Sequence, residues 1–190
     1  QLEVGATFSL EKCSRLSKLT PNLVIGGDLH ISHCKNILEL PPNLVVKGDV
    51  HLQYIDQLIC LPSDSSFHGS LNVTRCSSFI GLPDGLIVQG DLLLISCHLI
   101  TNLPSGLVVK GELTLKFNAR LQALPPDISI CKGLHLNQCY TLTTLPDQLF
   151  IDGPLSIVGC QGLKRLPVGL HVKGDVALKR NVRLEALPND

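Results

Sequence analysis

Hydrophobic side chains recur along this chain in a short alternating pattern with a fixed 21-residue period. Residues 112–116 show the pattern clearly, because Leu113 and Leu115 are separated and flanked by polar side chains. The same spacing recurs in residues 91–95. Apolar residues two apart are typical of a β-strand with one buried face. We therefore expect one short strand in every 21-residue unit, with its apolar residues pointing inward.

A second, shorter apolar pair precedes each predicted strand. Leu86 with Val88 is one such pair, and it predicts a brief extended segment on the opposite side of the unit. A glycine such as Gly111 stands just before the strand, which fits a tight corner where a Cβ atom would obstruct the chain. After the strand comes a Leu-Pro step, and proline biases the residue before it toward extended conformations. The Leu-Pro steps are Leu40-Pro41, Leu61-Pro62, Leu82-Pro83, Leu103-Pro104, Leu124-Pro125, Leu145-Pro146, Leu166-Pro167 and Leu187-Pro188.

The units follow one another without insertion or deletion. Stacked units need this constancy, because one extra residue would move every later apolar side chain out of register. The repeat therefore predicts a solenoid of nine 21-residue rungs. We expect a parallel β-sheet on its concave face, and extended or turn structure with little helix on its convex side.

A longer period of three rungs lies over the first. One position after each predicted strand reads Cys, Cys and an exception three times, the exceptions being Ile55, Asn118 and Asn181. The rungs with these exceptions also carry Lys47, Lys110 and Lys173, and Glu3, Ser66 and Ser129 recur with the same period. Residues 1–190 are thus predicted to form one array of three blocks of three repeats. The period has two interpretations: a surface feature every three rungs, or recent duplication alone.

The two chain ends indicate a fragment of a longer protein. Gln1 and Asp190 occupy the same repeat position, so the chain begins and stops within a rung, and it contains no Met. Natural solenoids end in atypical capping units. We expect flanking domains in the parent protein.

Composition narrows the class of partner. Sixteen basic and sixteen acidic residues give a net charge of zero, which offers no general attraction to nucleic acid or to an anionic membrane. The apolar runs are too short to cross a bilayer, and no secretory leader opens the chain.

Six of the eight cysteines share one repeat position: Cys13, Cys34, Cys76, Cys97, Cys139 and Cys160. Neighbouring rungs lie ~4.8 Å apart, a distance that a disulfide tolerates. We nevertheless favour a buried ladder of free thiols that cap turn backbone, as Asn would at the same position. Free thiols favour a reducing compartment. Cys60 and Cys131 lie off this ladder and are predicted to be the exposed thiols.

The outward-pointing strand residues are the candidate binding site. Curved solenoids bind partners across the concave face, and Leu93 and Ile95 are apolar where the repeat otherwise has polar residues. They form either an exposed apolar patch that marks a partner site or two ordinary exposed aliphatics. The predicted partner-binding residues are His30, His51, Tyr54, Asn72, Leu93, Ile95, Thr114, Lys116, Phe117 and His135.

Metal and catalytic chemistry are weaker interpretations. His30 and His51 should lie on adjacent rungs, as a zinc pair would, but Glu11 is the only carboxylate expected near them on this face. A solvated polar surface fits better, so we predict no metal site and no cofactor. Catalysis needs a nucleophile, a base and an orienting group that converge in a pocket. A uniform solenoid offers a broad trough instead, and we predict no catalytic residue. Gly26-Gly27 opens a strand, whereas phosphate loops open a helix.

The frame in residues 92–104, Leu-x-Leu-x-x-Cys followed by Leu-x-x-Leu-Pro, resembles the leucine-rich repeat. Its Leu-Pro return resembles the short-repeat class of bacterial secreted effectors. Two features depart from that class: Cys mostly replaces Asn, and Gly-Asp precedes the strand. The resemblance implies a protein-binding array that recognises a target in the host cytoplasm. Such effectors often carry a separate ubiquitin-ligase domain, and no motif of that domain occurs here.

Two alternatives to this hypothesis remain open at the level of the sequence. The array could be a structural spacer or surface repeat protein that self-associates end to end. It could also be an extracellular receptor or adhesin module, which predicts disulfides between the ladder cysteines.

Overall fold

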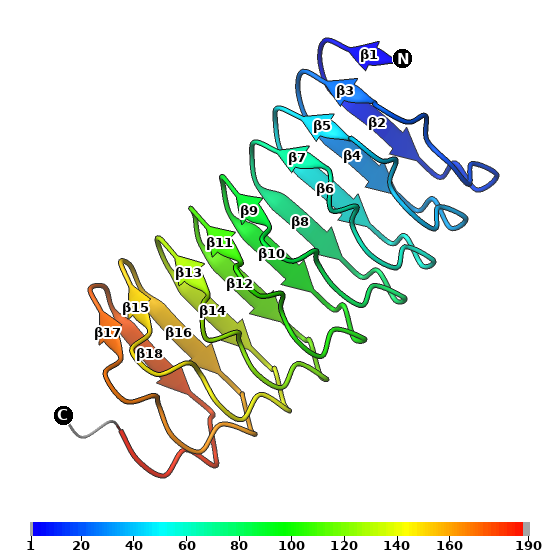
Figure 1. Cartoon of the computed structure of the whole chain (residues 1–190). Coiled ribbons are helices and arrows are strands. Elements are labelled where there is room, and N and C mark those ends of the chain that lie inside the picture. The colour runs from blue at the N-terminus through cyan, green and yellow to red at the C-terminus, as the bar shows by residue number, and fades with distance from the viewer. Residues whose placement is uncertain (1, 188–190) are drawn as a thin grey trace.

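The structure is a computed structural model, and it describes residues 2–187. The predictions that concern Gln1, Pro188 and Asp190 lie outside the described residues. Within them the chain winds into a regular stack of turns, and the predicted solenoid is confirmed (Figure 1).

Between residues 2 and 187, nine four-residue strands form one continuous parallel sheet, and each strand pairs with the equivalent strand of the neighbouring rung. This sheet is present because the alternating pattern places Leu92 and Leu94 on its buried side and aligns them with Leu113 and Leu115. The strands are β2 (Phe8–Glu11), β4 (Leu29–Ser32), β6 (Val50–Gln53), β8 (Leu71–Thr74), β10 (Leu92–Ile95), β12 (Leu113–Lys116), β14 (Leu134–Asn137), β16 (Leu155–Val158) and β18 (Val176–Lys179).

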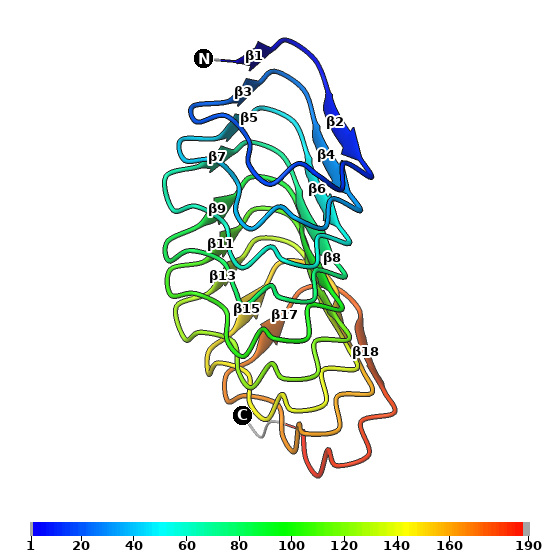
Figure 2. The ribbon, with the colours of Figure 1, turned by 90° about the vertical axis from the view of Figure 1, so that its right-hand side faces the viewer.

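Nine two-residue strands in the same range lie on the opposite side of the stack, as the second apolar pair predicted. They are β1 (Glu3–Val4), β3 (Val24–Ile25), β5 (Val45–Val46), β7 (Ser66–Phe67), β9 (Ile87–Val88), β11 (Val108–Val109), β13 (Ser129–Ile130), β15 (Phe150–Ile151) and β17 (His171–Val172). Unlike the long strands, they form three separate sheets, β1-β3-β5-β7, β9-β11-β13 and β15-β17. Figure 2 shows the two kinds of strand along opposite sides of a gently bowed stack, with the nine-stranded sheet on the inner side.

We call the outward surface of the nine-stranded sheet the strand face, and the surface of the short strands the back face. A single hydrophobic core runs between them along the stack. No helix occurs between residues 2 and 187, so no segment there has the form of a helix that could span a membrane.

The glycine at the corner before the strand relieves crowding between rungs in seven of the nine, whereas Ala6 and Lys132 hold the same position in the other two. A Cβ on Gly111 would lie 2.6 Å from the backbone carbonyl of Gly90, closer than real Cβ contacts allow. The predicted tight corner is therefore confirmed. The residue after this glycine adds a polar ladder that the sequence analysis did not predict. Asp49 Oδ1 accepts a hydrogen bond from the Ser70 N–H at 2.7 Å, and Asp91 Oδ1 accepts one from the Glu112 N–H at 2.8 Å.

Every long strand is followed by a residue in the left-handed backbone conformation, with φ between 52° and 65°. Only one of these nine residues is a glycine, although this conformation is unfavourable for other residue types. In the first eight rungs the turn is held by the next rung: the Tyr54 N–H, for example, donates to the Thr74 carbonyl at 3.0 Å. The residues are Lys12, His33, Tyr54, Arg75, Ser96, Phe117, Gln138, Gly159 and Arg180.

The ladder cysteines connect consecutive rungs. The Cys97 thiol donates to the Val73 carbonyl of the preceding rung at 3.5 Å. At the same position, Asn118 Nδ2 donates to the Leu94 carbonyl at 2.8 Å, and its Oδ1 also accepts the Cys97 N–H at 3.0 Å. Asn118 thus bonds to two groups of the preceding rung.

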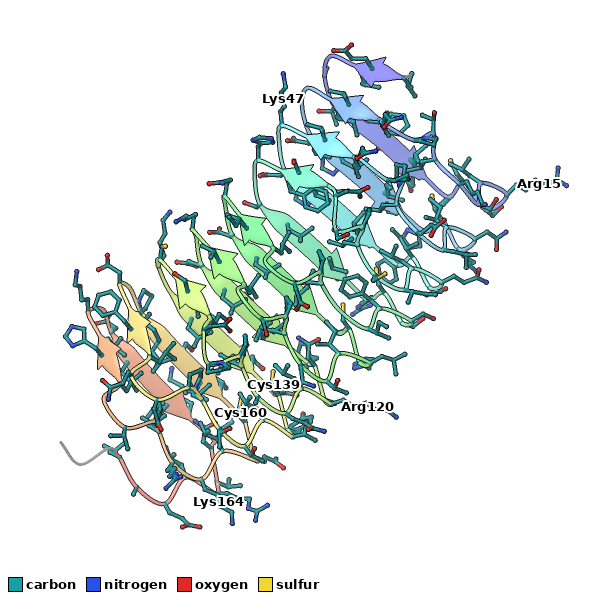
Figure 3. All side chains as sticks on the ribbon, viewed as in Figure 1. Arg15, Lys47, Arg120, Cys139, Cys160 and Lys164 are labelled. Atoms are coloured by element: carbon teal, nitrogen blue, oxygen red, sulfur yellow. The ribbon has the colours of Figure 1, made fainter. Side chains whose placement is uncertain are left out.

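All eight cysteines are free thiols in the structure. Cys34, Cys76, Cys97, Cys139 and Cys160 are buried, whereas Cys13 in the first rung is partly exposed. Of the two cysteines off the ladder, Cys60 is exposed as predicted and Cys131 is only partly so. Figure 3 shows Cys139 and Cys160 close together on adjacent turns.

Candidate functional site

The predicted partner-binding residues lie in ordered rows on the strand face. Strand register places His30 beside His51, and Leu93 between Asn72 and Thr114. His135 pairs with Thr114 from the other side, and Ile95 pairs with Lys116. Tyr54 and Phe117 follow directly after their strands. The sheet therefore brings eight of the ten predicted residues onto one surface, and Tyr54 and Phe117 lie in the turns at its edge.

Side-chain exposure differs from the sequence-based expectation at the centre of this surface. Leu93 and Ile95 are half-buried against their neighbours, and Thr114 is only 9% exposed. Phe117 is 39% exposed and is the one large hydrophobic of the predicted set in the exposed class. The apolar centre therefore consists of a partly sunken aliphatic pair with an aromatic ring projecting at its edge.

The histidines of the strand face have carboxylates nearer than the sequence analysis expected. His30 Nε2 lies 4.0 Å from Asp28 Oδ2, and His135 Nε2 lies 3.4 Å from Glu112 Oε2. The expectation that Glu11 is the only nearby carboxylate was wrong, because the residue before the strand turns back toward this face.

His30 and His51 stack face to face, with ring centroids 4.5 Å apart and planes 5° from parallel. Among the described residues, no group of three His, Cys, Asp or Glu side chains is arranged to hold a metal ion.

A second cluster, made of His33, Tyr54 and Arg75, is built from the left-handed residues of three consecutive rungs. We call it the arginine stack. The rings of His33 and Tyr54 lie 4.5 Å apart, and the Arg75 guanidinium carbon lies 5.4 Å from the Tyr54 ring centroid. Arg75 also donates a hydrogen bond to the Tyr54 hydroxyl at 2.8 Å. His33 and Arg75 were absent from the predicted site, although their 21-residue spacing from Tyr54 was the signal that could have included them.

Three of the buried thiols, Cys76, Cys97 and Cys139, are poorly suited to nucleophilic chemistry. Burial raises the pKa of Cys76 to about 11 and that of Cys97 to about 12. A hydrogen bond with Cys160, together with burial, raises the pKa of Cys139 as well. Because the thiolate is the reactive form, these thiols stay protonated and unreactive at neutral pH.

The strand face therefore offers a long, rigid surface with a sunken apolar centre and an aromatic and cationic cluster beside it. No protein-family model matches the chain, and no curated protein is significantly similar to it. The parallel-strand solenoid with 21-residue turns is consistent with a leucine-rich-repeat-like architecture.

Proposed function

We propose that this chain is a protein-recognition module whose strand face is the contact surface. One observation carries the proposal. The inward positions of the sheet are almost uniformly Leu, Ile or Val, whereas the outward positions in the same register change from His to Asn, Leu, Thr and Ser along the stack. A rigid scaffold that presents a different side chain at each step suits recognition, whereas a spacer has no need of such variety.

The chemistry of the surface favours a protein partner. Tyr54 and Arg75 belong to residue types that dominate binding energy at protein interfaces, and Phe117 belongs to the aromatic types that are enriched there. The arginine stack holds its guanidinium in place before binding, which reduces the side-chain entropy lost on association. Polar histidine, asparagine and glutamine side chains surround these groups, as in the polar rim of an interface. With a net charge of zero, the chain has no general attraction for a polyanion.

We infer a bacterial effector acting on a host protein as the setting. The Leu-Pro return of the repeat supports this setting by resemblance. The free, protonated thiols of the core fit a reducing compartment such as a host cytoplasm. In this proposal the array binds its target and catalyses nothing itself.

The test is a binding measurement with the array as bait in a host-cell lysate. The double variant Tyr54→Asn/Phe117→Asn removes both aromatic rings, and Asn is among the residues that best tolerate the left-handed backbone there. Lys12→Asn is the matched control, because Lys12 has the same conformation at the end of β2, outside the predicted site.

A protein captured by the parent and by Lys12→Asn, but lost by the double variant, would support recognition through the strand face. Equal capture by all three, or no specific capture by any, would argue against it. Concentration-dependent end-to-end oligomers in the same samples would then favour the structural-spacer alternative.

A further inference from the structure

Two equivalent pockets open on the back face, one of about 270 Å³ and one of about 320 Å³. We call them the first and second back pockets. Ser66, Asp84 and Ile87 line the first, and Ser129, Asp147 and Phe150 line the second. Every lining residue of the first pocket has a counterpart in the second that lies three rungs later in the sequence. The three-rung period of the sequence therefore has a structural counterpart on this surface.

The pockets lie where the back-face sheet is interrupted, between β7 and β9 and between β13 and β15. At an intact junction the Val108 N–H donates to the Leu86 carbonyl at 3.0 Å. Within the described part of the chain, the equivalent N–H groups of Ile87 and Phe150 make no such bond. Each pocket thus contains backbone donors and acceptors whose equivalents at the other junctions are hydrogen-bonded between rungs.

The interruption has a local cause in the return segment. Asn43 and Gly106 adopt left-handed conformations in the return, but the equivalent residues Asp64 and Asp127 do not. Ser65 also stands where most other rungs bury a leucine, which leaves space in the first pocket, and its hydroxyl oxygen is buried without a protein partner.

The space suits a small ligand better than an added peptide strand. Cα atoms of β13 and β15 approach within 8 Å of each other. Inserting a strand would need about 9.6 Å, which is two spacings of ~4.8 Å. The pocket volumes fall near the lower end of the range for small-molecule sites, roughly 300 Å³.

The polar groups of the two back pockets disfavour the binding of ions and favour the binding of hydroxyl groups. Asp84 Oδ1 accepts the Ser105 N–H at 3.1 Å, and Asp147 Oδ1 accepts the Val168 N–H at 3.1 Å. The second oxygen of each carboxylate remains as an acceptor and would repel an anion. A simple cation would leave the backbone N–H groups unpaired, whereas a hydroxyl group can donate to the carboxylate and accept from an N–H.

Apolar side chains form the rim of both pockets. Ile87 is 48% exposed in the first, and Phe150 is 49% exposed in the second. The Phe150 ring stacks on His171 of the next rung at a centroid distance of 5.2 Å, and the ammonium nitrogen of Lys173 lies 5.4 Å from the ring centroid. These surfaces can cover the C–H face of a ligand whose hydroxyl groups point into the pocket.

We propose that the back pockets are paired sites for a neutral polyhydroxylated ligand, namely two non-adjacent sugar units of one glycan chain. Three rungs separate the two sites, about 14 Å at ~4.8 Å per rung. One oligosaccharide can therefore occupy both sites, and occupancy of one raises the effective concentration at the other.

The test is an NMR titration of the full chain with maltohexaose, xylohexaose and mannohexaose. The amides of Ile87 and Gln89 report on the first pocket, and those of Phe150 and Asp152 report on the second. We expect one of these sugars to shift both sets and to leave the strand-face amides unchanged. Titration to about 10 mM detects even a dissociation constant of about 1 mM.

Two variants give the controls. Ser65→Leu restores the leucine of the other rungs and should abolish the shifts in the first set only, weakening binding of the hexasaccharide about tenfold or more through lost avidity. Asp147→Asn keeps the shape and the bond to Val168 but replaces the Asp147 carboxylate with an amide. It should therefore weaken binding at the second pocket and reduce the shifts of the Phe150 and Asp152 amides. Absence of shifts with all three sugars, shifts in only one set of the parent, or no effect of either variant would overturn the proposal.

Discussion

At the scale of single residues, one position per rung reports on the packing of the whole stack. That position holds a Cys in six rungs, an Asn in two and Ile55 in one, and both Cys97 and Asn118 donate to a carbonyl of the preceding rung. The thiol can do so only while it is protonated, which ties the stability of the core to pH.

Alkaline pH should therefore destabilise the fold through the buried thiols. Burial raises the pKa of Cys76 to about 11 and of Cys97 to about 12, from the ordinary 9.0. The folded chain then holds more protons than the unfolded chain above pH 9, so this stability is present below pH 9 and is lost between pH 9 and about 11 to 12. Each thiol should contribute a slope of about 1.4 kcal/mol per pH unit. Urea unfolding at a series of pH values measures the slope.

The variant Cys97→Asn provides the internal comparison. Asn118 shows that an Asn fits this position, and an Asn does not titrate. The substitution should therefore lower the slope by the contribution of one thiol, about 1.4 kcal/mol per pH unit. Cys60→Ser, which changes an exposed thiol, should leave the slope as it is. An unchanged slope in Cys97→Asn would show that its thiol does not couple to folding.

At the scale of elements, the turns after the long strands join one rung to the next. Asn118 bridges two of them because its amide donates to Leu94 and accepts from Cys97. Consecutive parallel strands are joined only through the remainder of a rung. Hydrogen bonds between neighbouring turns therefore add to the stability of each junction between rungs.

Replacing Asn118 with Ala should cost about 2–4 kcal/mol of unfolding free energy, because a buried N–H and a buried carbonyl lose their partners together. Asn118→Cys should cost about half as much, because a thiol can still donate to Leu94. Chemical denaturation of both variants tests the order. Asn36→Ala is the matched control: it deletes an exposed amide that donates to the Ser14 carbonyl and should cost less than about 1 kcal/mol. Equal costs at positions 118 and 36 would contradict the bridging role.

At the scale of the molecule, the sheets of the strand face and of the back face differ in how far they continue along the stack. The nine-stranded sheet is uninterrupted, whereas the back-face sheet breaks after β7 and again after β13. The two breaks are three rungs apart, although the nine-stranded sheet and the core continue through both of them. Each rung contacts only its neighbours, as in other solenoids.

Deleting residues 71–133 should leave a shorter array with the same fold. The deletion removes three whole rungs and joins Ser70 to Leu134, which occupies the position of Leu71 in its rung. The denaturant m-value should fall by about a third, since less surface is buried. Deleting residues 71–130 instead shifts every later leucine out of register and should abolish cooperative unfolding. A folded, cooperative product from the second deletion would show that register is not what holds the stack together.

The sequence predicted most of the scaffold because the scaffold depends on local, periodic features. Alternation placed Leu92 and Leu94 in the core, glycine marked the crowded corner, and the Leu-Pro return excluded helix. The candidate strand-face residues followed from the same alternation. Their exposure did not, since the burial of Thr114 depends on the size of Leu93 and His135 on neighbouring rungs.

By itself, then, the sequence determined the period, the strands and the side of the sheet on which each residue lies. The arginine stack, the polar ladder after the corner glycines, the left-handed turns and the two back pockets were decided only by the tertiary structure. Each of these features joins groups of different rungs or depends on the backbone path of a neighbouring rung. A pattern of residue types records which side a residue lies on, but contacts between rungs exist only once the rungs are stacked.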